Sequence, residues 1–75
     1  MLNDIETERE VAGYRLKLLA LVDRYETGAR SLVAAEAREC ADALICLMEE
    51  APLGKRASID YLVDRYEALR ISCSN

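Results

Sequence analysis

Apolar residues recur every three or four positions along most of the chain, which is the spacing of one face of an α-helix. The first stripe contains Val11, Tyr14, Leu18, Leu21, Val22 and Tyr25. A second stripe, one residue out of phase with the first, contains Val33, Ala37, Cys40, Leu44, Leu47 and Ala51. A third contains Ile59, Leu62, Val63, Tyr66 and Leu69. The pattern predicts an all-α fold with three helices.

Glycine, proline and serine mark the two breaks between the stripes. Gly28 can cap the first helix and Ser31 can open the second. Pro52 and Gly54 end the second helix, and Ser58 is a candidate N-cap for the third. One long bent helix in place of the first two is the alternative. We predict a single domain over residues 1–75, with helices over about 4–27, 31–51 and 57–72.

The start of the first helix carries two possible capping boxes, Asn3 with Glu6 and Thr7 with Glu10. Both turns between helices are short, so neighbouring helices should run antiparallel. The expected architecture is therefore a small three-helix up-down-up bundle, or a helical hairpin plus a third helix. A chain of 75 residues buries little apolar surface alone, and this favours self-association as additional support.

A six-residue segment occurs twice: Leu21–Glu26 recurs letter for letter as Leu62–Glu67. Each copy places its leucine, valine and tyrosine on one helical face, with most of the charged side chains outside that face. Equivalent packing of the first and third helices against the middle one explains the repeat. Ancestral duplication or a self-complementary dimer contact are the alternatives.

Two helices carry more apolar surface than their core stripes require. Additional apolar residues on the first helix are Ile5, Ala12, Leu16 and Leu19, and those on the second are Ala34, Ala41, Ile45 and Met48. Isolated exposed leucines are common on protein surfaces and are the simpler explanation. Because four apolar residues align on the first helix, we expect these two faces to form the contact surface of a homodimer.

Three of the four tyrosines lie on core stripes, whereas Tyr61 does not. Tyr61 is one helical turn from Arg65, and exposed tyrosine and arginine are enriched where proteins bind each other. We therefore predict that Tyr61 and Arg65 face a partner. A solvated tyrosine that stacks on its own arginine is the alternative.

The composition argues against catalysis and cofactors. The chain has no histidine, and its glycines are isolated, so the common nucleophile–base pairs and phosphate loops are absent. Its three cysteines lack the spacing of a metal site. Cys40 should be buried. Cys46 should be exposed, either as an inert thiol or as a redox-responsive one. We expect no enzyme activity, no cofactor and no metal.

The charge balance points to another protein as the partner. The net charge of −4 disfavours nucleic acid and anionic lipid, and no apolar run is long enough to span a membrane. We expect a cytoplasmic adaptor or regulator of bacterial or phage origin, such as an inhibitor, an anti-activator or a chaperone, that occludes its partner through an apolar helical surface. One alternative is a DNA-binding helix-turn-helix that uses Lys55 and Arg56. The other is an acidic nucleic-acid mimic that uses Glu36, Glu39 and Asp42.

Overall fold

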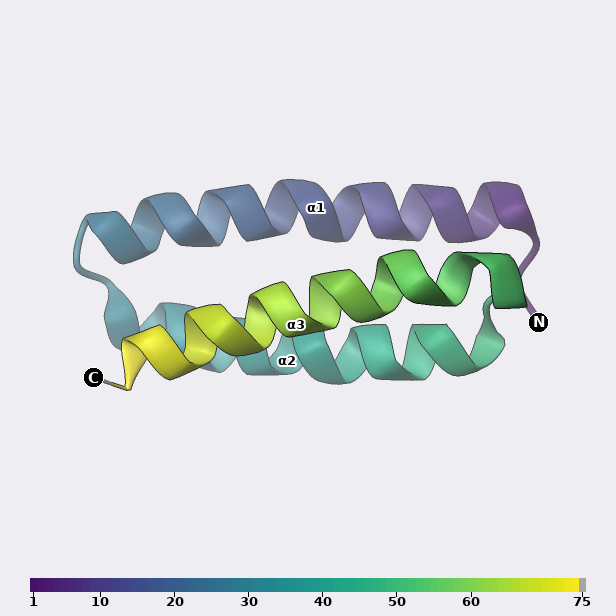
Figure 1. Cartoon of the computed structure of the whole chain (residues 1–75). Coiled ribbons are helices and arrows are strands. Elements are labelled where there is room, and N and C mark those ends of the chain that lie inside the picture. Colours follow the sequence, from purple (N-terminus) through teal and green to yellow (C-terminus); the bar gives the residue numbers. More distant parts are fainter. Residues whose placement is uncertain (75) are drawn as a thin grey trace.

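The computed structural model describes residues 1–74, and these form three α-helices with one short 3-10 turn. Along the chain they are α1 (Asp4–Glu26), α2 (Arg30–Glu50), the turn η1 (Leu53–Lys55) and α3 (Arg56–Cys73). The helices run up, down and up, so that α1 and α3 are parallel and α2 is antiparallel to both (Figure 1). The predicted all-α three-helix bundle is confirmed.

The first helix begins and ends where its local sequence predicts. Of the two possible capping boxes, the one formed is Asn3 with Glu6: the Asn3 side chain accepts from the Glu6 backbone N–H, and the Glu6 side chain accepts from that of Asn3. At the other end Gly28 has a φ of +100°, a left-handed conformation that glycine adopts without a steric penalty. This turn separates α1 from α2 and excludes one long bent helix.

The starts of the second and third helices differ from the prediction. The N-cap of α2 is Ala29 rather than Ser31, and no side chain caps this end. The third helix begins at Arg56, two residues before Ser58, because the η1 turn leads directly into it. Both serines therefore lie inside their helices.

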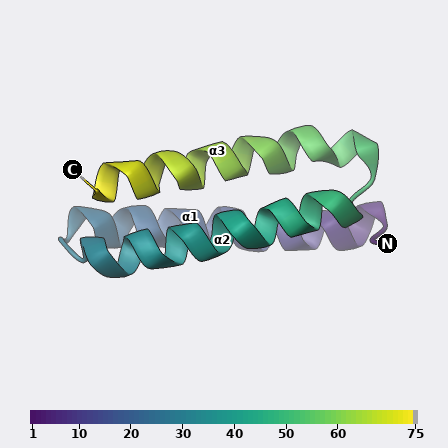
Figure 2. The same ribbon diagram turned by 90° about the horizontal axis from the view of Figure 1, so that it is seen from below.

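The core lies mainly between α2 and α3, and α1 packs on it from one side. The α2–α3 contact is by far the most extensive of the three helix pairs. In α1 only Thr7, Val11 and Leu21 are buried, whereas α2 has six buried residues and α3 has five. Figure 2 shows α1 behind α2, with α3 along their side. The first helix is thus the one whose surface is least covered.

The structure corrects the position of Ala41, which the sequence pattern assigns to an intermolecular contact. Its side chain is fully buried in the chain's own core. Alanine is small enough to let neighbouring helices approach closely, so the α2 core face is wider than a single stripe. Met48 is half-buried and packs against the same core. The predicted apolar surface of α2 is therefore smaller than its sequence indicates.

The two copies of the repeated segment share one buried position and differ in burial at two others. Leu21 and Leu62 are both buried, in agreement with equivalent roles in the core. Val63 and Tyr66, however, are buried, whereas Val22 and Tyr25 are half-buried. The second copy lies in the middle of α3 and the first copy at the end of α1, so the same six letters meet different neighbours.

Candidate protein-interaction surfaces

An apolar stripe on α1 faces solvent and is hereafter called the outer stripe. It consists of Ile5, Ala12, Leu16 and Leu19. The three large side chains are 67 % (Ile5), 69 % (Leu16) and 67 % (Leu19) exposed, so the chain's own core does not cover them. Isolated leucines with this exposure are common, but here three large apolar side chains and one alanine align over four helical turns. The outer stripe can contact another molecule without unfolding the bundle.

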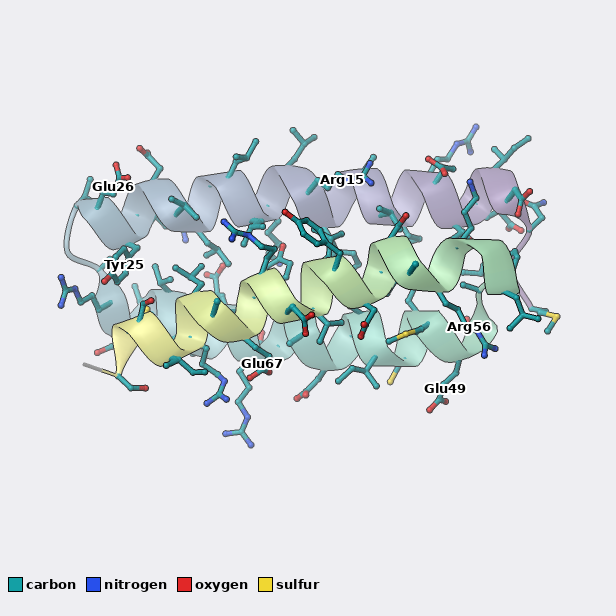
Figure 3. The ribbon with its side chains drawn as sticks, viewed as in Figure 1. Arg15, Tyr25, Glu26, Glu49, Arg56 and Glu67 are labelled. Carbon is teal, nitrogen blue, oxygen red and sulfur yellow. The ribbon has the colours of Figure 1, made fainter. Side chains whose placement is uncertain are left out.

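The predicted residues of α2 lie on a different part of the molecule. Ile45 and Met48 line a shallow hollow together with Glu49 and Arg56. Figure 3 shows Glu49 and Arg56 at the N-terminal end of α3, on the side of the bundle away from α1. One flat contact therefore cannot cover both this hollow and the outer stripe, and the predicted contact surface is split in two.

A third surface is a groove of about 330 Å³ between α1 and α3. The C-terminal end of α3 lies farther from α1 in Figure 1 than its N-terminal end does. We call this hollow the α1–α3 groove. It is lined by Leu18, Val22, Tyr25, Glu26, Arg65, Ala68, Leu69 and Ser72. Most of its lining is apolar, and its charged groups are the Glu26 carboxylate and the Arg65 guanidinium.

The groove is wide because small side chains from α3 meet larger ones from α1. Ala68 and Ser72 stand on the α3 side, whereas Val22 and Tyr25 stand on the α1 side and remain half-buried. Larger residues at the two α3 positions would fill this space. At the end of the groove, the Arg30 guanidinium lies 4.9 Å from the centre of the Tyr25 ring, a cation–π contact that holds this ring in place.

One residue of the predicted partner-facing pair lines this groove. Arg65 is a lining residue, whereas Tyr61 is not; Tyr61 is one helical turn earlier on α3 and 66 % exposed. The sequence pattern assigns Leu18, Val22 and Tyr25 to the core, so it misses their place in a groove. The signal for it is the small size of Ala68 and Ser72 beside an otherwise bulky core stripe.

Two ion pairs involve side chains on which the two nucleic-acid alternatives depend, Lys55 for DNA binding and Glu36 for nucleic-acid mimicry. The Lys55 ammonium contacts the Glu8 carboxylate at 2.5 Å, and this hydrogen bond lowers the pKa of Glu8 and raises that of Lys55. The Arg24 guanidinium contacts the Glu36 carboxylate at 3.3 Å. In addition, α2 and α3 run antiparallel side by side (Figures 1 and 2), whereas the helices of a helix-turn-helix cross at about 90–120°.

The cysteines divide as the sequence predicts. Cys40 is buried, Cys46 is exposed and Cys73 is intermediate, and all three are free thiols. Burial raises the pKa of the Cys40 thiol. Across residues 1–74 no group of three or more potential ligands is positioned to hold a metal ion. None of the helices in that range combines the length and the apolar character needed to cross a membrane.

Comparisons with known proteins do not assign the chain to a family. No protein-family model matches it, and no curated protein or solved structure shows significant similarity to it.

Proposed function

We propose that this protein is a small protein-binding adaptor or regulator that holds an amphipathic helix of its target in the α1–α3 groove. The observation that supports this proposal is the apolar groove between two parallel helices, with the exposed Tyr61 one helical turn before the groove residue Arg65. Binding of a helix in such a groove uses side chains at positions i, i+3 or i+4, and i+7. The proposal assigns binding to the protein and no catalysis.

The dimensions of the groove define the bound segment. From Leu18 to Tyr25 its α1 wall extends over about two helical turns, or about 10 Å at 1.5 Å per residue. A target helix of two to three turns can place its apolar anchors along this length. Its side chains would pack against Val22, Tyr25 and Leu69, and would occupy the space above Ala68.

The charges at the groove predict which charged side chains a target helix carries. A target helix is best matched when a cationic side chain approaches Glu26 and an anionic side chain approaches Arg65. The net charge of −4 also favours a basic target, because long-range attraction raises the rate of encounter. Binding should therefore weaken as salt concentration rises. Once bound, the adaptor would occlude the apolar face of the target helix.

We also propose a reducing compartment, such as a bacterial or phage-infected cytoplasm, as the place of action. All three cysteines are free thiols, including the exposed Cys46. Disulfides form and persist mainly in oxidising compartments.

The proposal is tested by capture of the target from the native host with matched variants. Ala68→Glu places a charge in the apolar groove, whereas Ala57→Glu places the same charge on another exposed position of α3. We expect a protein captured by the wild-type chain to be lost with Ala68→Glu and kept with Ala57→Glu. The direct interaction is then measured with purified components.

Circular dichroism and thermal unfolding should show that both variants keep the fold, because both positions are exposed. The proposal is wrong if every protein captured by the wild-type chain is captured equally by both variants.

A further inference from the structure

The outer stripe of α1 is interrupted by one cationic residue near its start and followed by one anionic residue. Positions 5, 9, 12, 16, 19 and 23 follow one another at alternating spacings of four and three, as in the seam of a coiled coil. Four of these positions are the outer stripe, and the other two are Arg9 and Asp23. All six side chains are exposed. The seam therefore begins with Ile5, is cationic at its second position, is apolar from Ala12 to Leu19 and is anionic at its last position.

Local contacts leave these end charges available. Near Arg9, the Glu8 carboxylate already pairs with Lys55. Near Asp23, the Arg24 guanidinium already pairs with Glu36. Within residues 1–74, Arg9, Asp23 and Glu26 form no ion pair. On the seam positions themselves the free charge is positive at Arg9 and negative at Asp23, and the free Asp4 carboxylate flanks the start of the seam.

We infer that the outer stripe binds a second copy of this chain, with the two α1 helices antiparallel about a twofold axis between Leu16 and Leu19. In this arrangement Leu16 packs against the partner's Leu19, and the reverse contact forms by symmetry. Arg9 then comes opposite the turn that carries the partner's Asp23 and the partner's Glu26. A parallel pair would instead place like charges opposite each other at both ends.

This contact leaves the α1–α3 groove open in both copies. Of the groove-lining residues of α1, Leu18 and Tyr25 lie more than a quarter-turn away from the outer stripe, whereas Val22 lies about 60° from Leu19, at about 100° per residue. A dimer would hence present two grooves on a single assembly, and a bivalent target would bind it more tightly than a monomer. Self-association and target binding share Glu26 and otherwise use different residues, so Ala68→Glu, which changes only the groove, tests target binding alone.

Charge reversal tests the orientation of the pair. Sedimentation velocity over a range of concentrations should show that Arg9→Glu or Asp23→Arg raises the dimer dissociation constant by about tenfold, because two symmetric contacts become repulsive. The triple variant Arg9→Glu/Asp23→Arg/Glu26→Arg restores opposite charges across the axis and should recover most of the affinity. The inference is overturned if the wild-type chain stays monomeric, or if the triple variant dimerises no better than the single variants.

Cysteine pairing gives a second measurement that does not depend on electrostatics. In a background of Cys46→Ser and Cys73→Ser, Ala12→Cys comes beside the partner's position 23 in the antiparallel pair. Chains with Ala12→Cys and chains with Asp23→Cys should form a disulfide when mixed but not separately, because like positions are roughly 16 Å apart along the axis. Crosslinking of each variant with itself would indicate a parallel pair and overturn the inference.

The groove variant separates this inference from the proposed function. Ala68→Glu should leave the dimer dissociation constant unchanged. A monomeric wild-type chain whose target capture is still lost on Ala68→Glu would refute the dimer and retain the adaptor. A wild-type chain that dimerises but whose target capture is unaffected by Ala68→Glu would refute the adaptor and retain the dimer.

Discussion

The Tyr66 hydroxyl of α3 donates a hydrogen bond to the backbone carbonyl oxygen of Tyr14 in the middle of α1. Tyr66 is fully buried, and its pKa is raised above the ordinary value chiefly by burial. The Cys40 thiol of α2 lies beside it. Side chains or backbone of all three helices therefore meet at this point. It ties α1, the helix with the fewest buried residues, to the α2–α3 pair.

Replacement of Tyr66 by phenylalanine should destabilise the bundle by about 1 kcal/mol, the usual net contribution of one hydrogen bond. The ring remains in the core, so the loss of stability measures the contribution of the hydroxyl group alone. Urea denaturation measures the free energy of unfolding, and Tyr61→Phe is the matched control because its ring is exposed. Equal stability of Tyr66→Phe and the wild-type chain would show that this hydrogen bond contributes nothing.

Alkaline pH should destabilise the protein through the same cluster. Burial raises the pKa of Cys40 above 9.0 and that of Tyr66 above 10.0, whereas in the unfolded chain both groups titrate near those values. The unfolded state then releases protons that the folded state retains. The free energy of unfolding should consequently be constant at neutral pH and fall from about pH 8.5 upward, and it should still be falling above pH 10 because the pKa of the Tyr66 hydroxyl is raised above 10.0 in the folded state.

Urea titrations across this pH range measure the fall, and the double variant Cys40→Ala/Tyr66→Phe should show a smaller one. A free energy of unfolding that rises with pH, or an identical fall in the double variant, would contradict this account.

The sequence predicts the helices well because local signals are strong in α1. Asn3 and Glu6 form a capping box, and Gly28 supplies the left-handed residue that ends the helix. The N-caps of α2 and α3 are predicted wrongly because Ser31 and Ser58 resemble N-cap residues. Each helix begins before its serine, at Arg30 and Arg56. At these ends the turn geometry outweighs the preference of a single serine.

The surfaces are only partly predictable, because periodicity shows which face is apolar but not how far a neighbour covers it. Ile5, Leu16 and Leu19 are exposed, whereas Ala41 is covered by the core. The α1–α3 groove depends on the slant between two helices and on the small side chains of Ala68 and Ser72. No single stripe encodes that relationship.

Loss of the α1 cap should be measurable in the unfolding of the whole bundle. Asn3→Ala removes the acceptor for the Glu6 backbone N–H and should cost about 1 kcal/mol. Ser58→Ala is the control, because this exposed serine lies inside α3, and its effect should be within about 0.5 kcal/mol. Similar effects of the two substitutions on urea denaturation would refute the assigned caps.

The cysteines should differ in their reactivity towards a thiol reagent. Cys46 is exposed and should react first at neutral pH, whereas Cys40 is buried with a raised pKa and should react only as the bundle opens. Cys46→Ser should therefore remove the fastest phase. Mass spectrometry of partly labelled protein identifies the order, and early labelling of Cys40 would show that the core at this point is open.

The central claim is that α1 carries more apolar surface than its own bundle covers, and that a second molecule covers it. Sedimentation velocity with two matched variants tests this most directly: Leu16→Asp changes the outer stripe, and Leu32→Asp changes a leucine of similar exposure on α2. The account predicts a concentration-dependent dimer for the wild-type chain and for Leu32→Asp, and a folded monomer for Leu16→Asp. Identical monomers for all three chains at every concentration would contradict it.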